Sequence, residues 1–127
     1  MFSTRIATQI YAKICFETTL GQKKIIEKLS EYLAGDDFSR IFVLNGYAGT
    51  GKTTLIAALV GALKDLNIKP ILLAPTGRAA KVLAQYAQEK AFTIHKRIYR
   101  QRTNADYESK YSLNFNAEKG AVFIVDE

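Results

Sequence analysis

The residues with the clearest chemical meaning form a glycine-rich run at positions 46–53. The run reads Gly-Tyr-Ala-Gly-Thr-Gly-Lys-Thr, which fits the pattern G-x-x-x-x-G-K-[ST] in full. Glycines let the backbone wrap closely around an anion, so that successive amides point at phosphate oxygens. Lys52 then reaches the β- and γ-phosphates, and the Thr53 hydroxyl is a ligand for Mg²⁺. The run therefore predicts a site for a nucleoside triphosphate, Mg-ATP. The expected binding residues are Gly46, Gly49, Thr50, Gly51, Lys52, Thr53 and Thr54.

Two adjacent acids, Asp126 and Glu127, follow the apolar run 122–125. A short apolar run is typical of a buried strand, and ligands of open parallel sheets sit beyond the carboxyl ends of the strands. Asp126 is expected to hold Mg²⁺, and Glu127 to orient or deprotonate an attacking water, because phosphoryl transfer depends on positioning and charge neutralisation. Together with Lys52 they are the expected catalytic residues. The alternative is a strand that ends in two solvated acids.

The elements around these residues alternate between apolar strands and helices. We expect strands at 40–45, 70–74, 110–115 and 121–125, and helices at 4–15, 20–33, 52–66, 77–89 and 94–99. Strands that are apolar throughout indicate a parallel sheet covered on both faces. The expected fold class is α/β, a P-loop NTPase with a RecA-like layered domain and a mainly parallel sheet.

Three helix starts carry capping residues. Thr19 and Gln22 have the spacing of a capping box, and Thr76 and Thr93 each precede a predicted helix. The helix over 77–89 is expected to turn one face inward. That face comprises Val82, Leu83, Tyr86 and Ala87.

The 127 residues suit one domain, and their charge is unevenly distributed. The chain has 18 Lys and Arg against 12 Asp and Glu, and residues 78–102 hold seven of the basic residues with one acid, Glu89. Such an excess is the electrostatic footprint of a polyanion binder, or else a solvated basic face. A single cysteine, no signal-peptide core and no apolar run of membrane-spanning length lead us to expect a cytoplasmic protein without a membrane.

Four segments in this order resemble the first motor domain of superfamily 1B DNA helicases, of the RecD-like type to which the exonuclease V alpha subunit belongs. They are LNGYAGTGKTT at 44–54, LAPTGRAAKVLA at 73–84, TIHKRIY at 93–99 and VFIVDE at 122–127, and the likeness covers roughly residues 20–127. The resemblance implies contacts to single-stranded DNA. The DNA-binding residues that it implies are Pro75, Thr76, Gly77, Arg78, Thr93 and His95. It also implies that Gln22 reads the adenine edge, although Gln22 also suits the capping box alone.

The resemblance implies an ATP-dependent DNA helicase with roles in DNA repair and recombination. Residues 1–18 would form a leading helix, and residues 19–127 the N-terminal part of a motor core that is incomplete at its C-terminus. A second motor domain would then be missing from this chain, the fragment alone would be inactive as a helicase, and nuclease or recombination partner subunits would be expected. Two other functions stay open. One is a small-molecule kinase that holds its acceptor with Arg97, Arg100 and Arg102; the other is a nucleic-acid-binding module without activity.

Overall fold

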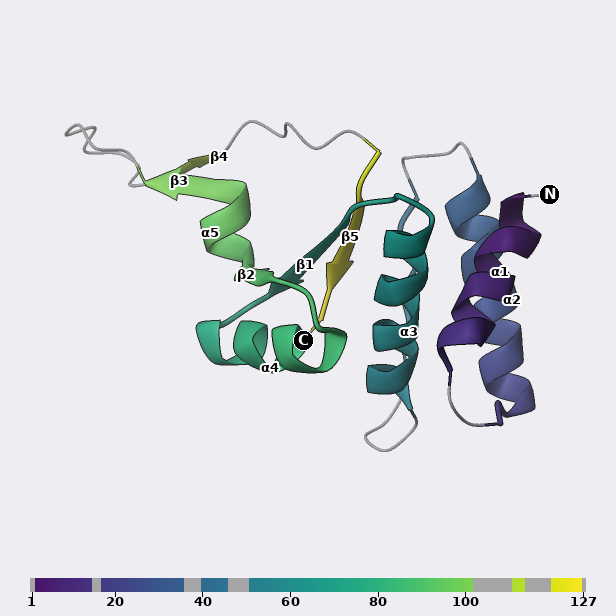
Figure 1. Ribbon diagram of the computed structural model, residues 1–127. Coiled ribbons are helices and arrows are strands. Elements are labelled where there is room, and N and C mark those ends of the chain that lie inside the picture. The colour runs from purple at the N-terminus through teal and green to yellow at the C-terminus, as the bar shows by residue number, and fades with distance from the viewer. Residues whose placement is uncertain are drawn as a thin grey trace. The chain divides into compact units, whose positions relative to one another are not determined.

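The structure is a computed structural model that describes residues 2–14, 17–35, 40–45, 51–101, 111–113 and 120–126. The chain divides into two compact units, residues 1–67 and residues 68–127. Figure 1 shows the helices of the first unit in purple to teal and the strands of the second in teal to yellow. Each unit is described by itself.

The first unit is built from three helices. They are α1 (Phe2–Lys13), α2 (Leu20–Ala34) and α3 (Lys52–Asp65), and α1 packs against both of the others. Apolar residues at four-residue spacing place Ile6 and Ile10 of α1 in the core, where both are fully buried. Ile26 of α2 and Leu63 of α3 are also fully buried. The helices expected over 4–15, 20–33 and 52–66 are therefore confirmed.

The strand expected at 40–45 is wrong. These residues are in neither a helix nor a strand, and among the described strands none pairs with them. Ile41 and Val43 expose 85% and 70% of their surface. Phe42, between them, is half-buried, and the centroid of its ring lies 5.6 Å from that of Tyr32. The apolar pattern is that of a strand, but a strand also needs a hydrogen-bonded neighbour, and sequence pattern does not supply one.

The second unit contains a three-stranded parallel sheet with the order β2-β1-β5. The central strand β1 (Pro70–Ala74) pairs with β2 (Ala91–Thr93) on one side and with β5 (Val122–Val125) on the other. Leu72 and Leu73 of β1 are buried, as expected for a central strand of a parallel sheet. The parallel sheet with helices confirms the α/β class. The strand β2 is an addition, since the sequence predicted no strand at 91–93.

The helix α4 (Gly77–Ala87) packs against β1 and β2. Its buried residues are Ala80, Leu83 and Ala87, which follow helical spacing on one stripe. Val82 was expected on that inner face, but 52% of it is exposed, because it lies about 100° around the helix from Leu83. Leu83 and Ala87 confirm the rest of the prediction, and Tyr86 is half-buried.

A short helix and two short strands complete the unit. The helix α5 (Ile94–Ile98) follows β2 directly, and β3 (Tyr99–Gln101) pairs in antiparallel fashion with β4 (Tyr111–Leu113). The helix expected at 94–99 is thus confirmed. The strand expected at 110–115 is present over 111–113, and its remaining positions lie outside the described residues.

Candidate nucleotide and nucleic-acid site

The described part of the glycine-rich run is the start of α3. Gly51 precedes the helix with φ 84° and ψ 13°, a left-handed conformation that glycine adopts without strain, and no side chain caps the helix there. Lys52 is the first helical residue and is half-buried, while the next two residues, Thr53 and Thr54, are exposed. The first turn of α3 therefore offers backbone amides, a lysine and a hydroxyl at one helix start, which is the donor set that a phosphate group needs.

Gln22 lies beside this helix start. Its side-chain oxygen accepts a hydrogen bond from the backbone amide of Thr19 at 2.9 Å, and its backbone amide donates to the Thr19 hydroxyl at 3.2 Å. The expected capping box is therefore present. A Cβ added to Gly51 would lie 2.8 Å from the Gln22 side-chain nitrogen. The structure therefore brings the nitrogen end of Gln22 against the glycine-rich run while its oxygen end caps α2.

In the second unit, three expected site residues meet at one edge of the sheet. The strand register sets Ala74 beside Thr93 and Leu73 beside Val125, and the Asp126 amide continues the ladder by donating to the Leu73 carbonyl at 3.0 Å. Because all three strands are parallel, their carboxyl ends share this edge. Thr76, Thr93 and Asp126 thus belong to one sheet edge, although up to 50 residues of sequence separate them.

Both threonines at this edge cap helices. The Thr76 hydroxyl accepts from the Ala79 amide at 3.1 Å, and the Thr93 hydroxyl accepts from the Lys96 amide at 3.1 Å, as the sequence predicted. A hydroxyl has one hydrogen to donate besides its acceptor lone pairs. Each cap therefore leaves an O–H that can donate to an anion, so capping and anion binding are compatible at both positions.

The other expected DNA-binding residues surround these caps. Pro75, Gly77, Arg78 and His95 are all exposed. A Cβ added to Gly77 would meet no atom within 4 Å, and its φ is not in the left-handed region, so the fold does not require glycine at this position. The missing side chain instead leaves open space at the start of α4.

Asp126 is held by a residue that the sequence placed only in the core. The hydroxyl of Tyr86, in the last turn of α4, donates a hydrogen bond to Asp126 Oδ2. Figure 1 shows the end of β5 beside the last part of α4. Burial, followed by the hydrogen bond to Asp126 and its negative charge, raises the pKa of Tyr86 above its ordinary value. Tyr86 is therefore a neutral hydrogen-bond donor at neutral pH.

The donor set at this edge fits Mg²⁺ of the kind that accompanies a nucleotide. Among the residues that the structure describes, no three His, Cys, Asp or Glu side chains gather into a metal cluster. Mg²⁺ in nucleotide sites is held by one or two protein ligands together with phosphate oxygens and water. Tyr86 donates to Oδ2 of Asp126, so Oδ1 of the same carboxylate could serve as the protein ligand for Mg²⁺.

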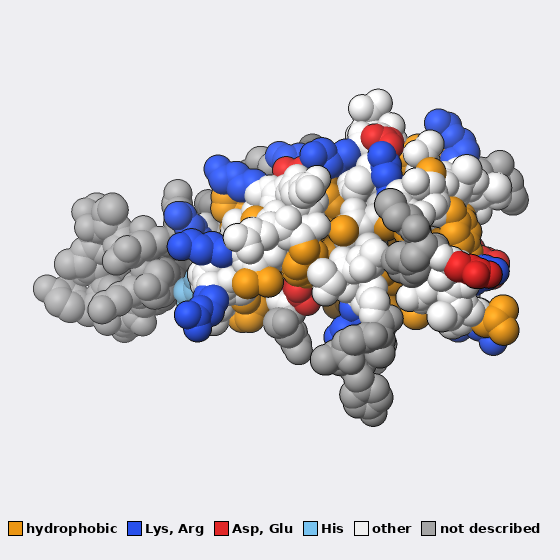
Figure 2. Space-filling model, turned by 60° about the horizontal axis from the view of Figure 1, so that its bottom comes forward, with side chains coloured by type: hydrophobic (Ala, Val, Ile, Leu, Met, Phe, Trp, Pro, Cys, Tyr) orange, Lys and Arg blue, Asp and Glu red, His pale blue; other side chains and the backbone are white. Residues whose placement is uncertain are grey.

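The basic residues of 78–97 whose burial the structure describes lie on the surface of the second unit. Arg78, Lys81, Lys90 and Lys96 are exposed, and Arg97 is half-buried. Figure 2 shows several Lys and Arg side chains gathered near the histidine, with few acidic side chains among them. The excess of charge is thus presented to solvent, where it acts on a polyanion as well as on counterions.

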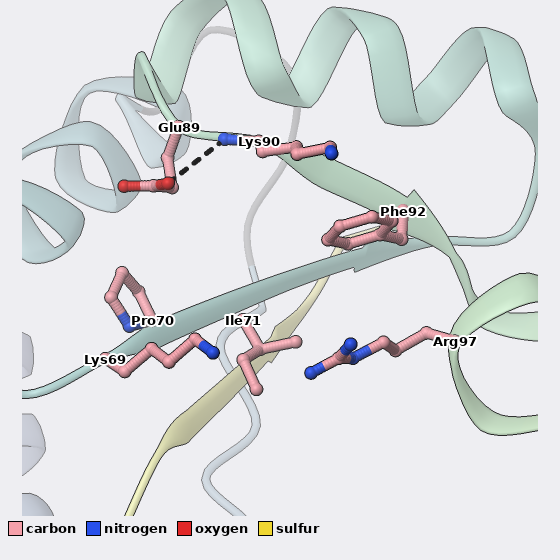
Figure 3. A pocket seen from close by; sticks show the side chains of 7 residues that line it. All are labelled: Lys69, Pro70, Ile71, Glu89, Lys90, Phe92 and Arg97. Atoms are coloured by element: carbon pink, nitrogen blue, oxygen red, sulfur yellow. Dashed lines mark hydrogen bonds between the residues drawn. The ribbon is translucent and has the colours of Figure 1, made fainter. Parts of the chain in front are cut away.

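Part of this charge surrounds a hollow of about 240 Å³. Figure 3 shows the ring of Phe92 between the side chains of Lys90 and Arg97. Lys90 Nζ lies 5.2 Å and Arg97 Cζ 5.6 Å from the centroid of that ring. Ile71 of β1 and Lys69, which directly precedes β1, line the hollow at the opposite end of that strand from Thr76. The lining residues are Lys69, Pro70, Ile71, Glu89, Lys90, Phe92 and Arg97. Sequence reasoning missed the hollow, although the basic count of 78–102 signalled part of it.

The remaining expected residues are not placed. Gly46, Gly49, Thr50 and Glu127 lie outside the described residues. The described residues of the nucleotide set belong to the first unit, apart from Asp126 in the second. Of the helices described, none combines the length and apolar character that crossing a membrane requires.

Comparison with known proteins assigns this arrangement to a family. Residues 19–127 match the model of the family described as AAA domain. The chain is also similar to the ATP-dependent RecD2 DNA helicase of Deinococcus radiodurans, with 39% identity over 57 residues that make up 45% of this chain and 8% of that protein. It is similar to the ATP-dependent DNA helicase dda of Enterobacteria phage T4, with 45% identity over 53 residues, 41% of this chain and 12% of that protein. These matches confirm the resemblance to RecD-like helicases, and with the parallel sheet they confirm the P-loop NTPase fold class.

Proposed function

This chain belongs to the AAA domain family, and we propose that it is the nucleotide-binding part of an ATP-driven motor that acts on single-stranded DNA. The observation that carries the proposal is the start of α3. A left-handed Gly51 is followed at once by Lys52 at the first position of a helix whose first turn has no side-chain cap. This is the local geometry in which helix amides and a lysine receive phosphate oxygens. The similarity to two DNA helicases supports the motor function.

Within this proposal, the first unit binds the nucleotide. The amides of 46–51 and of the first turn of α3 surround the phosphates, Lys52 neutralises charge at the β- and γ-phosphates, and the exposed Thr53 hydroxyl is a metal ligand. Gln22 reads the adenine edge with the side-chain amide that the capping box holds in place. Thr54, the third residue of α3, belongs to the same nucleotide-binding turn. Gly46, Gly49, Thr50 and Gly51 provide the close backbone approach.

Hydrolysis requires an acid at the edge of the sheet. Asp126 would hold Mg²⁺, usually through water, and Glu127 would orient or deprotonate the attacking water. Mg²⁺ supplies charge neutralisation between the terminal phosphates when it is bound. Substitution of either Lys52 or Asp126 is therefore expected to remove hydrolysis.

The DNA contacts are proposed at the edge built by Thr76 and Thr93. The hydroxyls of Thr76 and Thr93 and the exposed amides near Gly77 are donors for backbone phosphates, and Arg78 adds positive charge. Pro75 and His95 flank the same edge. The basic surface of the second unit supports this assignment, because non-specific affinity for nucleic acid comes mainly from such charge.

Calorimetry and hydrolysis of the intact protein test the nucleotide site. Lys52→Ala is expected to abolish ATP hydrolysis while binding of single-stranded DNA persists, since the two sets of contacts differ. Lys64→Ala, in the last turn of the same helix, is the matched control and should retain activity. Wild-type protein that takes up no nucleotide in the presence of Mg²⁺ would refute the proposed function.

The response to DNA separates a motor from the alternatives. ATPase activity of the intact protein should rise severalfold when single-stranded DNA is added, and it should proceed without any small-molecule acceptor. A kinase would instead release little phosphate until an acceptor was supplied. A nucleic-acid-binding module would bind DNA with strong salt dependence and hydrolyse nothing. An ATPase rate that is flat across all DNA concentrations would exclude the motor.

A further inference from the structure

The tyrosine beside Asp126 makes a contact that the proposed nucleotide and DNA contacts do not use. Tyr86 is in the last turn of α4, 40 residues before Asp126, and its hydroxyl donates to one oxygen of that carboxylate. The other oxygen, Oδ1, takes no part in that bond. A carboxylate with one oxygen fixed has a single preferred orientation, whereas an exposed aspartate at a strand end rotates among several.

We propose that Tyr86 is a positioning residue that fixes the orientation of the Asp126 carboxylate, so that its second oxygen is held ready to bind a divalent cation such as Mg²⁺. This inference rests on the proposed function. Groups that hydrogen-bond to a metal's ligands commonly set metal affinity by orienting those ligands, and their removal weakens metal binding by about 10- to 100-fold. Tyr86 would thereby couple α4, the helix that begins at the DNA-binding edge, to the acid at the end of β5.

The chemistry of the donor suits this role better than other side chains would. A tyrosine hydroxyl is neutral, so it leaves the full negative charge of Asp126 available for a cation. A lysine or arginine at the same place would neutralise that charge and compete with the metal. The side chain of Tyr86 also reaches the carboxylate while it remains half-buried.

A purely structural role for Tyr86 is the competing explanation, in which the hydrogen bond only ties α4 to β5. That role predicts lower stability when the hydroxyl is removed, with no change in metal affinity. The positioning role predicts weaker metal affinity even where stability is unchanged. The two are separated by measuring metal binding directly, beside the activity.

The experiment compares Tyr86→Phe with wild type in the intact protein. Mn²⁺ uptake is titrated by electron paramagnetic resonance in the presence of a non-hydrolysable ATP analogue, and the Mg²⁺ requirement of hydrolysis is measured in parallel. We expect the half-saturating metal concentration to rise about 10-fold in both assays, with the maximal rate at saturating Mg²⁺ less affected. Tyr11→Phe, which removes a hydroxyl from an exposed ring in α1, is the matched control and should change neither value.

Each outcome bears on the inference. A wild-type metal requirement in Tyr86→Phe would overturn it, whatever the stability of the variant. Tyr86→Gln returns a neutral N–H donor to the same helix position, and an intermediate metal requirement in that variant would support positioning by a hydrogen bond. Titrations are run below the melting temperature of each variant, and the Gln variant serves if the Phe variant does not fold. Wild-type protein without Mg²⁺-dependent hydrolysis would contradict the proposed function itself, a result distinct from failure of the Tyr86 effect.

Discussion

Replacement of Gly51 by alanine is expected to destabilise the first unit through two separable effects. The first is backbone strain, because φ 84° at Gly51 lies in the left-handed region, which costs a residue with a Cβ about 1–2 kcal/mol. The second is a collision, because the added Cβ would lie 2.8 Å from the side-chain nitrogen of Gln22. The side-chain oxygen of Gln22 accepts from the Thr19 amide at 2.9 Å, so we expect displacement of the side-chain nitrogen to cost this hydrogen bond. Loss of that bond costs about 0.5–1.5 kcal/mol.

A double-mutant cycle separates these two effects. Gly51→Ala alone should cost roughly 1.5–3.5 kcal/mol of unfolding free energy, the sum of strain and the lost capping bond. Gln22→Ala alone should cost about 0.5–1.5 kcal/mol through the capping bond. The double variant should be no less stable than Gly51→Ala, because the alanine at 51 has already displaced Gln22. The coupling energy is therefore expected to be about −0.5 to −1.5 kcal/mol.

Chemical denaturation without nucleotide measures the cycle. Gly21→Ala is the control, since its Cβ would lie 3.9 Å from the Thr19 hydroxyl, which is an ordinary contact. That variant should be as stable as wild type or slightly more so, because alanine restricts the unfolded chain. Additive costs for Gly51→Ala and Gln22→Ala, within about 0.5 kcal/mol, would refute the contact between Gln22 and the glycine-rich run.

Two further predictions concern the start of α4. Thr76→Ala should lower the free energy of unfolding by about 1 kcal/mol and speed hydrogen exchange at the Ala79 amide, because that amide loses its acceptor. Thr76→Asp should keep the cap and the stability but weaken single-stranded DNA binding severalfold, because it adds a negative charge. Equal DNA affinity in Thr76→Asp and wild type would contradict a phosphate contact at this position. Gly77→Ala should leave the free energy of unfolding unchanged or raise it by up to about 1 kcal/mol, because open space surrounds the added Cβ. The same variant should bind single-stranded DNA more weakly in a titration if a phosphate approaches the backbone at this position. Unchanged DNA affinity would remove Gly77 from the DNA contacts.

The helix caps and the central strand could be predicted from the sequence because they depend on local chemistry. Thr76 and Thr93 accept from amides three residues later in both cases, as short-range hydrogen bonding dictates. The strand β1 was recognisable because five apolar residues between turn signals fit a buried parallel strand. Such features involve residues within one turn of a helix or within one strand, so no knowledge of the rest of the fold is needed.

The failures occur where a residue's role depends on a distant partner. The segment 40–45 has the composition of a strand, but strand formation needs a neighbour that its own residues do not specify. The strand β2 is only three residues long and is created by its register with Leu72, Leu73 and Ala74. Tyr86 looked like a core residue because its position fits the helical stripe, and only the fold brings Asp126 to its hydroxyl.

Gln22 shows why one residue can satisfy both of the roles that the sequence offered. A glutamine side chain carries an acceptor oxygen and a donor nitrogen at different places. The oxygen accepts from the Thr19 amide, and this bond fixes the rotamer that brings the nitrogen to Gly51. The cap therefore orders the side chain before any ligand arrives, so a nucleotide would not have to immobilise it, which saves about 0.5–1.5 kcal/mol of side-chain entropy on binding. For the adenine contact proposed for Gln22, the capping box would hold the side chain in place beforehand. Thr19→Ala, which weakens the box but leaves Gln22 unchanged, should then lower nucleotide affinity as well as helix stability.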